Sequence, residues 1–156
     1  MTYSMDSTYL LDETSAEHGR LIRQAQIFGP FTERLFRDAG VDTGQRVLDV
    51  GSGVGDVALL AARLVGPSGA VIGVERDPNS VATASSRAAA AGLANVRFFE
   101  GEVGSVTTTE AFDAVVGRFI IEFLPDAGAV IRSLASVLRP GGSWRFRTPA
   151  GVRGWT

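Results

Sequence analysis

The most distinctive stretch of the chain runs from Val47 to Asp56 and reads VLDVGSGVGD. It begins as a short apolar run that holds one carboxylate and then places three glycines at every second position, Gly51, Gly53 and Gly55. Amphipathic helical periodicity resumes directly afterwards, so we predict a strand, a tight turn and a helix. Glycines this dense indicate a backbone that a ligand approaches closely, because a Cβ would obstruct the approach. The stretch therefore predicts a site for a nucleotide-like ligand.

Three acidic side chains stand in or soon after three predicted strands. Asp49 lies within the first strand, where its carboxylate needs hydrogen-bond donors from the turn amides or from a ligand. Glu75 ends the second strand, twenty residues beyond Gly55, and from there it can accept hydrogen bonds from both hydroxyls of a ribose. Glu102 follows the third strand and could accept from an exocyclic amine while the amide of Val103 faces a ring nitrogen. Together these residues predict an adenosine pocket.

A dinucleotide-dependent oxidoreductase is the alternative interpretation of a glycine-rich turn. That class predicts Gly-x-Gly-x-x-Gly, with its third glycine one position later than in this chain. A carboxylate just before the turn, at Asp49, also places a negative charge near two phosphates without a compensating cation nearby. The glycine spacing and the acid therefore favour a ligand without phosphates.

The elements that must position these residues alternate between strands and helices. The patterns predict strands over 46–50, 70–74, 95–99 and 112–116, and helices from the glycine turn to about residue 65, from Asp77 to Gly92 and over 126–138. This alternation predicts an α/β fold, a Rossmann-like, doubly wound, mostly parallel sheet with helices on both faces. Ligands of such sheets bind beyond the carboxyl ends of the strands, near the point where strand order reverses.

Two helices are predicted ahead of the first strand. Residues 1–14 read as a loose arm, and the stretch 14–17, Thr-Ser-Ala-Glu, fits a capping box that begins a helix ending near residue 28. Gly29 and Pro30 interrupt the pattern, and a second short helix follows and ends at Gly40. We expect a single domain over residues 1–156, made of the arm, the helices over 15–40 and a Rossmann-like core over 45–147.

Length, charge and composition exclude several classes of protein. At 156 residues the chain can bury a core without disulfides or a metal, and it contains no cysteine. Its formal net charge of −2 lacks the basic footprint that nucleic-acid binding requires. The N-terminal residues lack the basic and apolar regions of a signal peptide, and no apolar run reaches membrane length. We expect a soluble, cytoplasmic protein with no metal site that binds neither nucleic acid nor a membrane.

These motifs resemble those of the class I S-adenosylmethionine-dependent methyltransferases, over residues from about 15 to 142. The matching stretches are 47–56 for the first motif, 71–75 for the ribose-binding acid, 98–103 for the adenine, 112–118 for the fourth strand and 138–142 beyond it. The resemblance implies transfer of a methyl group from S-adenosylmethionine to a small-molecule acceptor.

The resemblance also implies a role for each matching residue. Gly51 and Gly53 line the methionine and ribose portions of the cofactor, and Glu75 holds the ribose hydroxyls. Glu102 and Val103 frame the adenine. The family usually carries aspartate where this chain has Glu102, and the extra methylene shifts the carboxylate.

The resemblance further implies that Arg118 borders the methyl-donor end. N-terminal helices often act as a lid in this family, which assigns that role to residues near Arg20, Gln24 and Ile27. The full set of predicted cofactor contacts is Asp49, Gly51, Ser52, Gly53, Gly55, Glu75, Arg76, Glu102, Val103, Arg118 and Gln24.

Methyl transfer requires few catalytic groups from the protein, because the cofactor implied by the resemblance carries a methyl group that is already activated. The main task is to hold a nucleophile in line with the sulfur–methyl bond. A general base is needed only if the nucleophile arrives protonated, and the candidates are Glu122, His18 and Asp126. His18, the only histidine, has the ordinary alternative of a solvated residue on a surface helix. Arg118 has the alternative of a structural cation that pairs with Asp113 or Glu122.

The chain departs from the family after Gly142. Members continue with an apolar central strand, a further helix and an antiparallel hairpin, whereas residues 143–149 alternate aromatic residues with arginine. Arginine on one face suits an exposed edge strand. The C-terminal strands of the family are therefore expected to be missing, through truncation, a changed reading frame or a naturally short protein. The second hypothesis is a non-catalytic module that binds S-adenosylmethionine or S-adenosylhomocysteine and self-associates through its sheet edge.

Overall fold

The computed structural model of the chain describes residues 7–38, 40–118, 124, 126–148 and 151–155. Its elements, in chain order, are α1 (Ser7–Asp38), β1 (Arg46–Val50), α2 (Asp56–Val65), β2 (Ala70–Glu75), α3 (Pro78–Ala90), β3 (Val96–Glu100), the 3₁₀ helix η1 (Val103–Ser105), β4 (Phe112–Arg118), α4 (Ala127–Ser136), β5 (Leu138–Thr148) and β6 (Gly151–Trp155). The predicted core alternation of strands and helices is confirmed, and β1 has the predicted bounds.

One six-stranded sheet forms the centre of the molecule, in the order β3-β2-β1-β4-β5-β6. β1 to β5 pair in parallel, and β6 returns antiparallel to β5. The chain first adds strands on one side of β1 and then crosses to the other side for β4, so strand order reverses between β1 and β4. The carboxyl ends of these two strands mark the crevice where sheets of this kind bind ligands. The predicted Rossmann-like α/β fold is confirmed.

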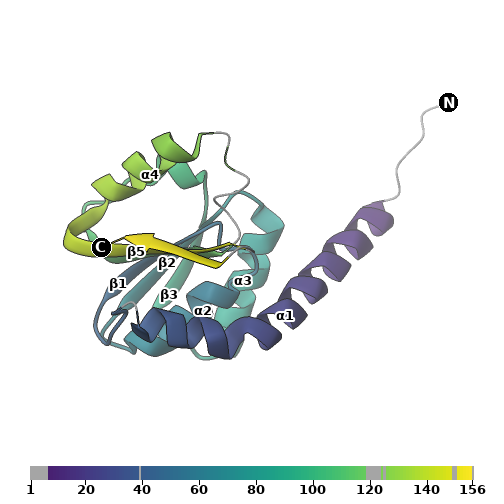
Figure 1. Cartoon of the computed structure of the whole chain (residues 1–156). Coiled ribbons are helices and arrows are strands. Elements are labelled where there is room, and N and C mark those ends of the chain that lie inside the picture. The colour runs from purple at the N-terminus through teal and green to yellow at the C-terminus, as the bar shows by residue number, and fades with distance from the viewer. Residues whose placement is uncertain (1–6, 39, 119–123, 125, 149–150, 156) are drawn as a thin grey trace.

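Helices cover both faces of the sheet, with α1, α2 and α3 on one side and α4 on the other (Figure 1). One core joins α2 and α3 to the sheet and includes Phe36 of α1. The second core lies under α4 and η1, where Leu134 and Val103 pack. Val47 and Leu48 of β1 are fully buried and belong to different cores, so the central strand supplies both faces. No helix in the described part of the chain is long and apolar enough to cross a membrane.

One carboxylate ties together three strand beginnings at the amino edge of the sheet. Asp113 accepts the backbone N–H of Arg46 at 2.7 Å, which joins the start of β4 to the start of β1. Its other oxygen pairs with Arg139 at the start of β5. Asp113 is therefore occupied at the amino edge, which rules it out as the partner that the sequence offered for Arg118.

Over the described residues 7–38, one long helix takes the place of the second half of the expected arm and of the expected pair of helices. α1 runs without interruption through Gly29 and Pro30. Pro30 removes one intrahelical hydrogen bond, but its fixed φ suits a helix, and contacts between α1 and α2 hold the segment. The expected capping box lies inside α1, where Glu17 instead pairs with Arg20 at 2.6 Å. Figure 1 shows the N-terminal end of α1 projecting from the body of the molecule.

The prediction of an exposed edge strand over 143–149 is wrong, because β5 lies between β4 and β6. Residues 151–155 fold back and pair with it, so that Trp155 stands opposite Trp144. The aromatic residues that alternate with arginine share one face, where Trp144 and Phe146 pack with ring centroids 5.4 Å apart. Phe146 is 3% exposed and belongs to the core under α4. The outer strands of the described sheet are therefore β3 and β6.

Gly55 and Gly92 offer a matched test of packing at the glycine turn, because both have left-handed φ values, +89° and +67°. A Cβ on Gly55 would lie 2.9 Å from Phe98 and 3.0 Å from Ala84, whereas one on Gly92 would meet nothing within 4 Å. We predict that Gly92→Ala lowers the free energy of unfolding by about 1–2 kcal/mol through strain. Gly55→Ala should lose about 1–3 kcal/mol more through overpacking. Urea unfolding measures both losses, and equal losses would contradict the packing argument.

Candidate ligand-binding site

The glycine turn between β1 and α2 is bound to the end of β2. The amides of Gly51 and Ser52 both donate to the Val74 carbonyl, at 2.9 and 3.1 Å. Gly51, Gly53 and Gly55 adopt φ values between 52° and 89°, a region that residues with a Cβ rarely adopt. A Cβ on Gly53 would meet nothing within 4 Å. The backbone at Gly53 therefore stands open to a ligand.

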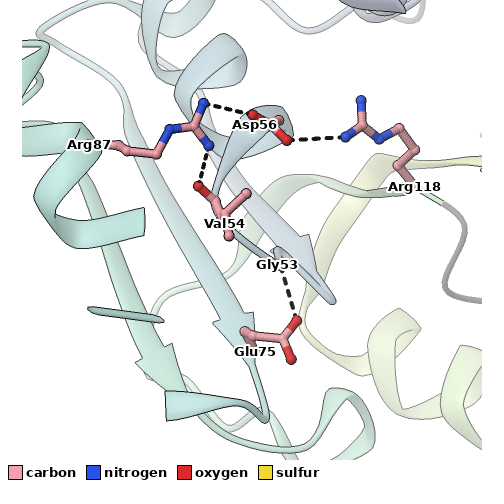
Figure 2. Close-up of polar contacts among 6 residues, drawn as sticks. All are labelled: Gly53, Val54, Asp56, Glu75, Arg87 and Arg118. Atoms are coloured by element: carbon pink, nitrogen blue, oxygen red, sulfur yellow. Dashed lines mark hydrogen bonds and ion pairs between the residues drawn. The ribbon is translucent and has the colours of Figure 1, made fainter. Parts of the chain in front are cut away.

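Glu75, the last residue of β2, links the glycine turn to the start of α3. Its Oε2 accepts the Gly53 N–H at 3.0 Å, which Figure 2 shows, and its Oε1 accepts the Asp77 N–H at 3.1 Å. A carboxylate oxygen accepts up to two hydrogen bonds, so each oxygen keeps the capacity for one more. The side chain is half-buried at the carboxyl edge of the sheet. Glu75 is thus held in place and can still accept hydrogen bonds from a ligand.

Asp77 caps α3, as the sequence predicted. Its Oδ1 accepts the Asn79 amide at 3.1 Å, and its Oδ2 accepts the Ser80 amide at 3.0 Å and the Ser80 hydroxyl at 2.7 Å. The Ser80 hydroxyl, followed by the two amides, lowers the pKa of the Asp77 carboxyl against the opposing effect of burial. The turn that presents the Asp77 amide to Glu75 is therefore fixed by its own cap.

Asp56, the first residue of α2, holds two arginines from two other elements (Figure 2). Arg87 of α3 pairs with it at 2.7 Å, and Arg118 at the end of β4 pairs with it at 3.3 Å. Arg87 also donates to the Val54 carbonyl within the glycine turn. The Asp56 side chain is 8% exposed, and a carboxylate this buried needs such partners. This ion-pair network joins α2, α3 and β4 beside the strand reversal.

Cavity volume alone does not identify the site. A cavity of 230 Å³ opens beside the Asp56 network, and Arg87, Arg118 and Thr32 contribute to its lining. A hollow of 390 Å³ reaches Glu102. A larger hollow of 720 Å³ lies near the amino ends of β1 and β2, away from the glycine turn. The polar groups at the carboxyl edge, rather than the volume, therefore define the candidate site.

Asp49, the second-last residue of the central strand β1, is 1% exposed. Burial raises the pKa of its carboxyl to about 8, although the Arg118 charge and the Ala58 amide oppose the rise. Its Oδ2 and the Ser52 hydroxyl are buried without hydrogen-bond partners among the described residues. The Ala58 amide, whose effect opposes the rise, belongs to α2 and not to the turn. A carboxyl with this pKa is largely protonated at pH 7, so Asp49 does not place a negative charge beside the turn. Of the two arguments against a ligand with phosphates, only the glycine spacing therefore holds.

The remaining predicted cofactor contacts have different surroundings. Glu102 is exposed at the N-terminus of η1 and makes no side-chain capping hydrogen bond there. The Val103 side chain is 7% exposed and packs in the core under α4. Arg76 is exposed just after β2. Gln24 lies in α1, but its side chain falls outside the described part of the structure, as does that of Ile27.

The candidates for a general base already have hydrogen-bond partners where they are described. Nε2 of His18 lies 3.2 Å from the Ser80 hydroxyl, and Nδ1 lies 3.2 Å from the Thr83 hydroxyl. Asp126 accepts the Ala129 amide at 2.8 Å and so caps α4. Glu122 lies outside the described residues. The described arrangement therefore assigns no base.

Sequence reasoning missed Asp56 and Arg87. Asp56 could have been identified by its position directly after the third glycine, at the start of a helix, where a negative charge is favoured. The signal for Arg87 was that it is the only charged residue of α3. Arg118 was predicted as a cofactor contact or as a partner of Asp113 or Glu122, and its ion pair in the described part of the chain is with Asp56.

Comparison with known proteins agrees with the fold. Residues 41–152 match the family described as "Methyltransferase domain". The chain therefore belongs to this methyltransferase family. The resemblance found in the sequence motifs is thereby confirmed at the level of the family.

Two curated relatives and one solved structure illustrate the similarity. The aklanonic acid methyltransferase DauC of Streptomyces sp. (strain C5) is 32% identical over 149 residues, which cover 95% of this chain and 67% of DauC. An arsenite methyltransferase of Halobacterium salinarum is 37% identical, over 67% of this chain and 27% of the relative. The crystal structure of a SAM dependent methyltransferase from Aquifex aeolicus superposes with a TM-score of 0.70 at 23% identity, over 74% of this chain and 62% of the other, and shows the fold.

The buried Asp49 carboxyl predicts how stability depends on pH. Its pKa is raised in the folded state from 3.8 to about 8, so between these values only the unfolded state releases the proton. The free energy of unfolding should therefore fall as pH rises through this window, by up to about 1.4 kcal/mol per pH unit. Asp49→Asn keeps the shape of the side chain but removes the group that titrates. The free energy of unfolding of this variant should therefore fall less than that of the wild type between about pH 5 and pH 8. Urea unfolding at several pH values measures this, and parallel profiles would contradict a raised pKa.

Proposed function

We propose that the chain binds S-adenosylmethionine at the carboxyl edge of its sheet and transfers the methyl group to a small-molecule acceptor. The observation that carries the proposal is the Glu75 carboxylate, fixed by the Gly53 and Asp77 amides at 3.0 and 3.1 Å with acceptor capacity to spare. A carboxylate at the end of the second strand of such a sheet is placed to accept hydrogen bonds from ribose hydroxyls. Membership of the methyltransferase family supports this donor.

The residues around the glycine turn fit this cofactor. The backbone at Gly53 is open on the side where a Cβ would project. The buried Asp49 Oδ2 and Ser52 Oγ lack hydrogen-bond partners among the described residues, and such atoms call for a ligand or an ordered water. On the β4 side, Arg118 is held by Asp56, and we place it beside the methionine portion. We place Glu102 and the amide of Val103 beside the adenine.

The cofactor, when bound, supplies a methyl group that is already activated. This chain's own residues then have to orient the two reactants, which is the largest contribution that a protein makes to such a transfer. Glu75 fixes the ribose, and the Asp56 network fixes the end of β4. Because His18 and Asp126 have partners within the fold, we propose that the acceptor presents a nucleophile that needs no protein base.

The names of two relatives give aklanonic acid and arsenite as their substrates, and these are chemically unlike. We propose a small molecule for this chain, because both of those substrates are small.

A non-catalytic module that binds the cofactor is the second candidate. This candidate is favoured because His18 and Asp126, the two described candidates for a general base, already form hydrogen bonds within the fold. Turnover separates the two candidates: formation of S-adenosylhomocysteine with a methylated acceptor supports the enzyme. Cofactor binding without turnover over a panel of acceptors supports the module.

Three further expectations belong to the proposal. We propose a cytoplasmic location and a single domain whose Rossmann-like core spans 45–147. Self-association would use β3 or β6, the outer strands of the described sheet, because β5 is interior. Sedimentation at several protein concentrations tests the last of these.

Glu75→Gln tests the proposed cofactor site. Glutamine keeps the size of the side chain but removes the charge and turns one oxygen into a donor that faces a backbone N–H. We predict that the dissociation constant for S-adenosylhomocysteine rises by about tenfold or more, since a hydrogen bond to a charged group contributes about 1.5–3 kcal/mol. Isothermal titration calorimetry with S-adenosylmethionine, S-adenosylhomocysteine and NAD measures the effect and the choice of ligand.

Glu110→Gln is the matched control, because Glu110 is 67% exposed and pairs with Arg46 near the amino edge of the sheet. Its affinity for S-adenosylhomocysteine should equal that of the wild type. Absence of binding of both S-adenosyl compounds to the wild type would contradict the proposal, and so would an unchanged affinity in Glu75→Gln.

A further inference from the structure

We propose that His18 is a positioning residue for the ligand site, because it holds α1 against the N-terminal part of α3 through Ser80 and Thr83. The inference rests on the proposed function, because it assigns Glu75 to the cofactor. It gives the only histidine of the chain a role other than that of a base.

Two hydrogen bonds join the His18 ring to one face of α3. Nε2 lies 3.2 Å from the Ser80 hydroxyl and Nδ1 lies 3.2 Å from the Thr83 hydroxyl. Residues three apart on a helix are neighbours, so the two hydroxyls form one docking point for the ring. Ser80 is 7% exposed and His18 is half-buried, so their contact is partly shielded from water. A hydrogen bond shielded in this way is stronger and more directional than one in water.

The network fixes the tautomer of the ring. The Ser80 hydroxyl has one hydrogen, and it donates that hydrogen to Asp77 Oδ2 at 2.7 Å. Toward His18 the Ser80 oxygen can then only accept, so Nε2 carries the proton and Nδ1 accepts from the Thr83 hydroxyl. Every donor and acceptor of the neutral ring has a partner in this arrangement.

Further hydrogen bonds connect the contact between His18 and Ser80 to the glycine turn. Asp77, which receives the Ser80 hydroxyl, donates its own amide to Glu75 Oε1 at 3.1 Å. Glu75 Oε2 accepts the Gly53 amide at 3.0 Å. A single chain of hydrogen bonds therefore runs from α1 through the cap of α3 to the carboxylate that we assign to the ribose. Loss of the first link frees the Ser80 hydroxyl to turn away from Asp77 and loosens the turn that presents the Asp77 amide.

His18→Ala removes the first link and leaves the groups that face the ligand in place. We expect the dissociation constant for S-adenosylhomocysteine to rise by about two- to thirtyfold, the range found for residues that act on a site through others. His18→Gln offers an amide donor and an acceptor to the same two hydroxyls and should recover most of the affinity. Thr83→Val keeps the cap of α3 intact and should weaken binding in the same direction. Calorimetry below the unfolding temperature of each variant measures the affinities.

Arg34→Ala is the matched control on the same helix, because Arg34 is 83% exposed and its ion pair is with Asp38 of α1. Its affinity should match that of the wild type. If His18→Ala unfolds at a lower temperature but binds the ligand as tightly as the wild type, the role is purely structural and the inference is overturned. If the wild type binds no S-adenosyl compound, the proposed function fails instead.

Nitrogen NMR of the imidazole ring gives a readout that does not depend on the ligand. With one histidine in the chain the signals belong to His18, and the wild type should show the tautomer protonated at Nε2 in neutral solution. Ser80→Ala should lose this preference. A ring protonated at Nδ1, or a ring in tautomer exchange like that of a free histidine, would overturn the inference.

Discussion

The hydrogen bonds of the Glu75 carboxylate are the constraint on which the candidate site depends. Glu75 ends β2, yet its two oxygens are bound to backbone amides that come before and after it, in the glycine turn and at the cap of α3. The amides of Gly51 and Ser52 reinforce the same junction by donating to the carbonyl of Val74. Two βα connections are thereby held as one unit at the carboxyl edge of the sheet. Either connection alone would be an ordinary tight turn.

Three acids near this edge have three different electrostatic states, set by their surroundings. Asp49 is buried with little compensation, and the raised pKa of its carboxyl keeps it largely protonated at neutral pH. Asp56 is also buried, but Arg87 and Arg118 balance its charge. Glu75 is half-buried and is held by backbone amides, so it combines a fixed position with access to a ligand. All three are acidic residues in the sequence, and only their three-dimensional neighbours separate a neutral carboxyl, an ion-paired carboxylate and a carboxylate held by backbone amides.

The elements that were predicted correctly are those set by interactions between residues close together in the sequence. The strand over 46–50, the glycine turn and the cap at Asp77 follow from periodicity and from side-chain hydrogen bonds within a few residues. Predictions failed where distant contacts decide: Pro30 reads as a helix breaker, but α1 continues through it and packs on α2. Residues 143–148 read as an edge, but the chain returns and pairs with them. Asp56 and Arg118 are 62 residues apart, so no local pattern could have paired them.

The strand order also bears on how the molecule assembles. β1 and β4 are neighbours in the sheet although the hydrogen bond that joins their starts, from Arg46 to Asp113, spans 67 residues of sequence. The pairings among β1, β2 and β3 close shorter loops, so this half of the sheet can form first. The β1–β4 pairing closes a longer loop and therefore has the larger entropy cost. The reversal point between β1 and β4, and with it the candidate ligand site, exists only after the two halves of the sheet have joined. A ligand bound across that point would stabilise the completed sheet over any half-formed intermediate.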